Sequence, residues 1–68
     1  MTSGKTISEN IKKLRSQLGL TQDDLAKNAD IKYTTLMKVE SGAVNKPSVQ
    51  TMAKIAKVLG VSIEELIK

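Results

Sequence analysis

Apolar residues in this sequence recur every three or four positions, the spacing that places side chains on one face of an α-helix. The first such stripe consists of Ile7, Ile11, Leu14 and Leu18. It predicts a helix from about residue 7 to 18, with Thr6 and Glu9 as a capping box at its start and Gly19 as the left-handed residue at its end. A chain with this period must build its core from packed helices.

Four further helices are predicted from the same spacing and from residues that begin helices. Thr21 with Asp24, Ser48, and Ser62 with Glu65 are placed to cap helix starts. Gly42 and Gly60 follow apolar stripes and are placed to end them. The predicted ranges are 22–29, 33–40, 49–59 and a short last helix after residue 62. We therefore expect an all-α fold of five helices without strands.

Length and composition restrict the possible functions. The 68 residues suffice for one domain, and we expect a flexible N-terminus over residues 1–5 before a domain over residues 6–68. Cysteine and histidine are absent, so the usual zinc ligands and the commonest general base are missing, and we expect no metal, cofactor or catalytic residue. No apolar run is long enough for a membrane span or signal peptide. The net charge of +4 favours a polyanionic partner.

The second and third predicted helices have the spacing of a helix-turn-helix motif, because about four residues separate 22–29 from 33–40. Ala26 is small where the two helices would cross, and Asp30 tolerates the positive φ that the turn requires. The residues predicted to face inward are Leu25, Ile31, Leu36 and Val39. Those predicted to face outward are Lys32, Tyr33, Thr34, Met37 and Lys38.

Several separated segments resemble the phage Cro and repressor family, also called the xenobiotic-response-element family. The matching segments are Gly19-Leu20-Thr21-Gln22, Leu25-Ala26, Leu36, Val39-Glu40-Ser41-Gly42, Pro47-Ser48 and Ile55-Ala56-Lys57-Val58-Leu59-Gly60-Val61-Ser62. Their order and number make the resemblance specific, and it covers about residues 7–67. It implies a compact, lambda-repressor-like domain that binds double-stranded DNA with its third helix in the major groove, usually as a two-fold dimer.

The resemblance also implies a role for particular residues. Tyr33, Thr34 and Lys38 would face base edges. Backbone contacts would come from Gln22, Lys32, Asn45 and Lys46. Arg15 and Glu40 match a charged pair that ties the first helix to the end of the third.

Two positions depart from the family pattern. Asp30 stands where glycine is usual, and Lys32 stands where a serine-like cap is usual. Asp tolerates the left-handed conformation at some cost, so the turn should survive. Lysine cannot accept a hydrogen bond from the helix start, which leaves open whether Asp30 caps the helix and whether the helix begins one residue away.

The end of the sequence suggests self-association. Ile63, Leu66 and Ile67 place three large apolar residues in one short helix. One helical face cannot bury all three against its own small core, so at least one should be exposed and available to a second copy. The alternative is that this helix only closes the core of the monomer.

We therefore expect a cytoplasmic, bacterial or phage-encoded transcriptional regulator that binds a palindromic operator, most simply as a repressor, and not an enzyme. The alternatives are the controller protein of a restriction-modification system, a DNA-binding antitoxin that also holds a protein toxin, and a helical module that only binds proteins. The neighbouring carboxylates of Asp23 and Asp24 could suggest a metal site, but acidic residues are favoured in the first turn of any helix.

Overall fold

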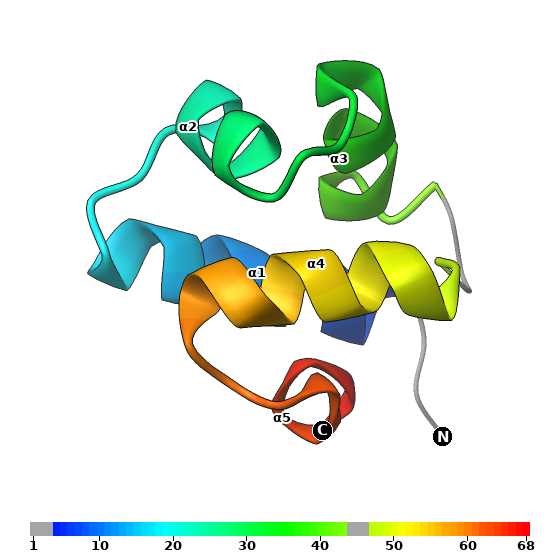
Figure 1. Ribbon diagram of the computed structural model, residues 1–68. Coiled ribbons are helices and arrows are strands. Elements are labelled where there is room, and N and C mark those ends of the chain that lie inside the picture. Colours follow the sequence, from blue (N-terminus) through cyan, green and yellow to red (C-terminus); the bar gives the residue numbers. More distant parts are fainter. Residues whose placement is uncertain (1–3, 44–46) are drawn as a thin grey trace.

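The computed structural model describes residues 4–43 and 47–68, and within these ranges it contains five helices and no strand (Figure 1). The all-α fold expected from the apolar spacing is confirmed. The helices are α1 (Gly4–Gln17), α2 (Gln22–Asn28), α3 (Tyr33–Glu40), α4 (Val49–Leu59) and α5 (Ile63–Ile67).

The start of α1 differs from the sequence prediction. The helix begins at Gly4, so Thr6 and Glu9 lie inside its first turns and the capping box predicted there is wrong. A Thr-x-x-Glu pattern caps a helix only where the backbone leaves the helical conformation before the threonine, and here the helix continues through it. Helix α1 therefore includes Gly4 and Lys5.

The predicted caps of α2 and α4 are present, and at α5 the Ser62 half of the predicted capping box is present. Thr21 Oγ1 accepts a hydrogen bond from Asp24 N at 3.0 Å, and Asp24 Oδ2 accepts one from Thr21 N at 3.1 Å, which completes the capping box. The hydroxyls of Ser48 and Ser62 each accept a hydrogen bond from a backbone N–H in the first turn of the following helix. Such caps stabilise a helix by about 0.5–2 kcal/mol each, which matters for helices this short.

The five helices share one hydrophobic core. In Figure 1, α2 and α3 lie across one side of α1 and α4, and α5 lies on the opposite side. Helix α3 contacts α1 and α2, α2 also contacts α4, and α5 contacts α1 and α4. The core residues are Ile7, Ile11, Leu25, Ala26, Leu36, Val39, Met52, Ile55, Ala56, Leu59 and Leu66. Because every helix contributes to one core, the orientation of α3 is fixed by packing from α1 and α2.

One residue of the first apolar stripe does not join the core. Leu18 follows the last residue of α1, and about half of its side chain (53%) is exposed. Gly19 adopts φ +70°, which turns the chain away from the helix axis just after Leu18. Over the described ranges, no helix is long and apolar enough to pass through a bilayer.

Candidate nucleic-acid interface

The turn between α2 and α3 has the geometry that the sequence predicted. Asp30 adopts a left-handed conformation with φ 56°, and Ile31 N donates a hydrogen bond to Ala26 O at 3.0 Å, which closes the turn. Lys32 is the N-cap of α3 and makes no side-chain cap. Helix α3 therefore begins at Tyr33 as predicted, and Asp30 does not replace the missing cap.

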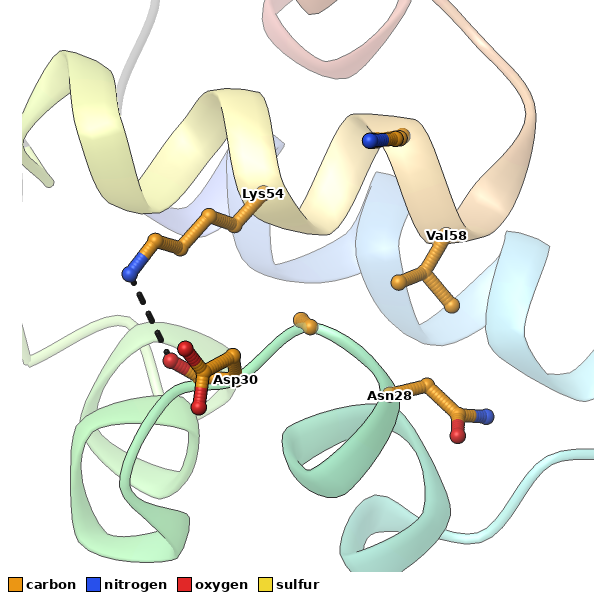
Figure 2. A pocket seen from close by; sticks show the side chains of 6 residues that line it. Asn28, Asp30, Lys54 and Val58 are labelled. Atoms are coloured by element: carbon orange, nitrogen blue, oxygen red, sulfur yellow. Dashed lines mark hydrogen bonds between the residues drawn. The ribbon is translucent and has the colours of Figure 1, made fainter.

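A lysine from α4 supports this turn. Lys54 Nζ donates to the backbone oxygen of Asp30 at 3.4 Å (Figure 2). Both residues line an open hollow of about 510 Å³ between α4 and the end of α2. The residues lining it are Asn28, Ala29, Asp30, Lys54, Lys57 and Val58. The ammonium group of Lys54 thus lies beside the carbonyl of Asp30, a residue held in a sparsely populated backbone conformation. The contact favours the backbone conformation of the turn that joins α2 to α3.

Helix α3 divides sharply into an inner and an outer face. Leu36, Val39 and Glu40 are buried beneath it. The residues predicted to face outward are exposed, and these are Lys32, Tyr33, Thr34, Met37 and Lys38. The outer face therefore presents a phenol, a hydroxyl, a thioether and two ammonium groups on one short helix, a set suited to contacts with base edges and phosphates.

Arg15 and Glu40 lie together beneath α3. Arg15 Nε donates to Glu40 Oε2 at 3.0 Å, and its Nη2 donates to Oε1 at 3.1 Å, so the pair is bidentate. Arg15 Nη1 also donates to Leu20 O at 2.9 Å. The Glu40 side chain is 1% exposed and that of Arg15 is 18% exposed. This geometry ties the end of α3 to α1 and to the segment before α2.

Gln22 connects this buried pair to the outer face. Its Nε2 donates to Glu40 Oε1 at 3.1 Å, and its Oε1 accepts a hydrogen bond from the Tyr33 hydroxyl at 3.3 Å. Tyr33 is 45% exposed. Three of the residues that we singled out thus form a continuous chain of hydrogen bonds from the buried carboxylate to the first residue of α3.

Two further side chains hold the helices in place and were missed by the sequence analysis. Ser8, which is buried, donates to the backbone oxygen of Glu40, and Asn10 Nδ2 donates to Leu66 O at 2.8 Å. Both partners are carbonyls at or near the end of a helix, where no intrahelical donor remains. The only signal in the sequence was that both polar residues flank the apolar stripe of α1.

The acidic residues near the start of α2 have structural partners. Asp23 Oδ2 pairs with Lys27 Nζ at 3.0 Å, and this hydrogen bond raises the pKa of Lys27. The hydrogen bond from the backbone of Thr21 lowers the pKa of Asp24. Within the ranges that the structure describes, no three acidic side chains are close enough to hold a metal ion.

The three apolar residues of α5 have different environments. Leu66 is fully buried in the core of its own chain, and Ile63 is partly buried against that core. Ile67 is 38% exposed. Leu66 therefore packs within its own chain, and Ile67 is the exposed apolar residue that the sequence predicts on this helix.

The two predicted phosphate-contact residues of the loop, Asn45 and Lys46, lie outside the described residues.

A short α2, a four-residue turn and an α3 with a polar, exposed outer face define a helix-turn-helix domain. The helix-turn-helix family model matches residues 11–66 of the sequence. An uncharacterized HTH-type transcriptional regulator of Archaeoglobus fulgidus is 38% identical over 56 residues, which cover 82% of this chain and 79% of that protein. The chain belongs to the helix-turn-helix family of DNA-binding transcriptional regulators, of the Cro and repressor type.

Solved structures support the same assignment. The N-terminal DNA binding domain of SinR from Bacillus subtilis has a TM-score of 0.91 and 30% identity, covering 94% of this chain and 93% of that one. SinR in complex with DNA has a TM-score of 0.87 and 31% identity over 91% of this chain and 98% of that one. The restriction-modification controller protein C.AhdI from Aeromonas hydrophila has a TM-score of 0.85 and 27% identity over 93% and 94%.

One relative is an enzyme, but the similarity covers little of it. The glutamine--fructose-6-phosphate aminotransferase of Methanocaldococcus jannaschii is 30% identical over 63 residues, which are 93% of this chain and only 6% of that protein. The matched segment is thus a small part of the enzyme and gives no support for its activity in this chain.

Proposed function

We propose that this protein binds double-stranded DNA at a specific sequence by placing α3 in the major groove, and that it regulates transcription without being an enzyme. The observation that carries the proposal is the outer face of α3, where polar and cationic side chains stand exposed on a helix whose inner face is buried in the core. The similarity to a SinR structure that contains DNA supports the same use of the domain.

The base-reading residues in this proposal are Tyr33, Thr34 and Lys38. All three are exposed on α3, and Tyr33 and Thr34 lie in its first turn, which enters the groove in domains of this kind. Lys38 can donate to guanine O6 and N7. Replacing Lys38 or Tyr33 with alanine should therefore weaken discrimination at particular base pairs.

A second group of residues would contact the sugar-phosphate backbone and set the position of α3. These are Gln22, Lys32, Asn45 and Lys46. Gln22 is the first residue of α2. Lys32 is the N-cap of α3 and makes no side-chain cap, which leaves backbone N–H groups at that helix start for phosphate oxygens. Such contacts supply affinity that depends on salt but little on sequence.

We further propose that two copies bind a palindromic operator and that α5 joins them. One short recognition helix contacts few bases, so specificity increases when two half-sites about 34 Å apart are read together. Ile67 and the exposed part of Ile63 would form the contact, while Leu66 keeps the helix on its own core. Sedimentation should show a dimer for the wild type and a monomer for Ile67→Asp. A matched control is Val49→Asp, which changes a 75% exposed apolar residue at the start of α4 and should remain a dimer.

Repression is the regulatory outcome that we propose, because a protein bound over a promoter blocks access to it without requiring any further contact. Its place of action would be the cytoplasm, where the DNA of a bacterium lies. A second candidate is control of a restriction-modification system, which the similarity to C.AhdI favours.

Selection of operators from a random pool of duplexes tests the proposed function. The expected result is a consensus with two-fold symmetry and half-sites one helical turn apart. Placing the operator between a promoter and a reporter then distinguishes repression from activation. Recovery of no preferred sequence would refute the proposal.

A further inference from the structure

The hydrogen bonds around Gln22 have a fixed direction. Each side-chain amide has a donor end and an acceptor end of nearly the same shape, so its partners decide its orientation. One end of the Gln22 amide lies 3.1 Å from the carboxylate of Glu40, which only accepts hydrogen bonds. The amino group must therefore face Glu40, and the amide oxygen faces Tyr33.

The carboxylate that sets this direction is itself firmly held. Both of its oxygens accept hydrogen bonds from Arg15, and its side chain is 1% exposed. The backbone oxygen of the same residue accepts a hydrogen bond from Ser8. Turning the Gln22 amide over would place two acceptors against each other beside a buried charge, which is costly. The orientation of the amide is thus determined by the core of the domain.

The orientation of the Gln22 amide also decides how the Tyr33 hydroxyl is hydrogen-bonded. The Tyr33 hydroxyl has a single hydrogen, and it is used in the hydrogen bond to Gln22 Oε1 at 3.3 Å. What remains toward solvent is the lone pairs of the hydroxyl oxygen. Phosphate oxygens also only accept hydrogen bonds, so this hydroxyl is poorly matched to the DNA backbone.

We propose that Tyr33 acts toward DNA as a hydrogen-bond acceptor and selects a base with an exocyclic amino group, adenine or cytosine, at the position that it faces. The inference rests on the proposed placement of α3 in the major groove. In that groove the adenine N6 and cytosine N4 amino groups are donors, whereas guanine and thymine present acceptors. The buried pair of Arg15 and Glu40 then orients the Gln22 amide, which in turn orients the Tyr33 hydroxyl that selects the base.

The first test compares wild type with Tyr33→Phe, which removes the hydroxyl and keeps the ring. We expect the wild-type operator to contain a position restricted to adenine or cytosine, and we expect the restriction to disappear in Tyr33→Phe. Replacing that base with an analogue that lacks the amino group should weaken wild-type binding by about tenfold, the effect of one lost hydrogen bond. The same replacement should leave binding by Tyr33→Phe unchanged.

The second test releases the tyrosine hydroxyl from its partner. Gln22→Met removes the amide oxygen that accepts from Tyr33 and leaves the Arg15–Glu40 pair in place. The hydrogen of the Tyr33 hydroxyl is then free to point at the base, so the preference for adenine or cytosine over guanine or thymine should fall. Circular dichroism checks that this variant is folded.

The outcomes separate this inference from the proposed function. If the wild type selects no sequence, both are overturned. If it selects an operator but Tyr33→Phe relaxes a preference for guanine or thymine, or relaxes none, the acceptor role is overturned and the proposed function stands. Because Gln22→Met also removes the proposed phosphate contact, its readout is the ratio of affinities for two duplexes and not affinity itself.

Discussion

Removing the arginine of the buried ion pair should destabilise the fold far more than removing an exposed lysine. In Arg15→Met, Glu40 Oε2 loses the donor that lies 3.0 Å away, and Oε1 keeps only Gln22. Breaking a buried pair by removing one partner costs about 3–5 kcal/mol, because the remaining charge is desolvated and unpaired. Arg15 is 18% exposed, so water can reach part of the vacated space, and we expect the lower end, about 3 kcal/mol.

This loss is large for so small a domain. Stability of roughly 0.05–0.15 kcal/mol per residue gives a total of about 3–10 kcal/mol for a chain of this size. A loss of about 3 kcal/mol should lower the melting temperature by roughly 12–24 °C. Thermal unfolding followed by far-ultraviolet circular dichroism measures this directly.

Two controls separate the buried charge from other effects of the substitution. Lys27→Met removes the cation of the exposed pair with Asp23 and should leave the melting temperature nearly unchanged. The double variant Arg15→Met with Glu40→Leu should be more stable than Arg15→Met alone, because it leaves no buried charge. The reasoning is wrong if Arg15→Met has the same melting temperature as Lys27→Met. It is also wrong if the double variant loses as much stability as Arg15→Met and Glu40→Leu lose together.

Three further predictions concern single residues. Lys46→Ala should weaken binding to all duplexes alike and lower the slope of log affinity against log salt by about one, and a change at one operator position only would contradict a phosphate contact. Asp24→Asn should lower the melting temperature near neutral pH, because the folded state lowers the pKa of Asp24 and the ionised carboxylate is therefore stabilising. The difference from wild type should shrink below about pH 4 as this carboxyl becomes protonated, and a difference independent of pH would count against the argument. Gly60→Ala should lower the free energy of unfolding by about 1–2 kcal/mol in chemical denaturation, because Gly60 has φ +73°, which an alanine adopts only at a cost. Nothing lies within 4 Å of the added methyl group, so a steric clash would not contribute. An unchanged denaturation midpoint would contradict this cost.

Local signals in the sequence predicted most of the fold. Thr21, Ser48 and Ser62 each precede an apolar stripe, and a cap depends on residues within one turn of the helix start. The same holds for the outer face of α3, because helical spacing alone separates Leu36 and Val39 from the exposed residues. Local patterns failed at Thr6, where a capping pattern lies inside a longer helix.

Contacts between distant parts of the chain could not be predicted in this way. The hydrogen bond between Ser8 and Glu40 joins residues 32 positions apart, and that between Asn10 and Leu66 joins residues 56 positions apart. Neither has a local signature, because each depends on how the helices are packed. Similarly, the spacing within α5 showed that its three large apolar residues could not all be buried, but only packing against α1 and α4 decided that Leu66 is buried and Ile67 is exposed.

The central claim is that the outer face of α3 reads DNA sequence, and a ratio of affinities tests it most directly. The measurement compares binding to the selected operator and to a scrambled duplex for wild type, Lys38→Ala and Lys13→Ala. The last is a matched control, because Lys13 lines a hollow together with Glu65 of α5. Helix α5 lies on the side of α1 and α4 opposite α2 and α3 (Figure 1). Lys38→Ala should reduce the preference for the operator by about fivefold or more, whereas Lys13→Ala should leave it unchanged. Equal preference for the operator in all three proteins would contradict the claim.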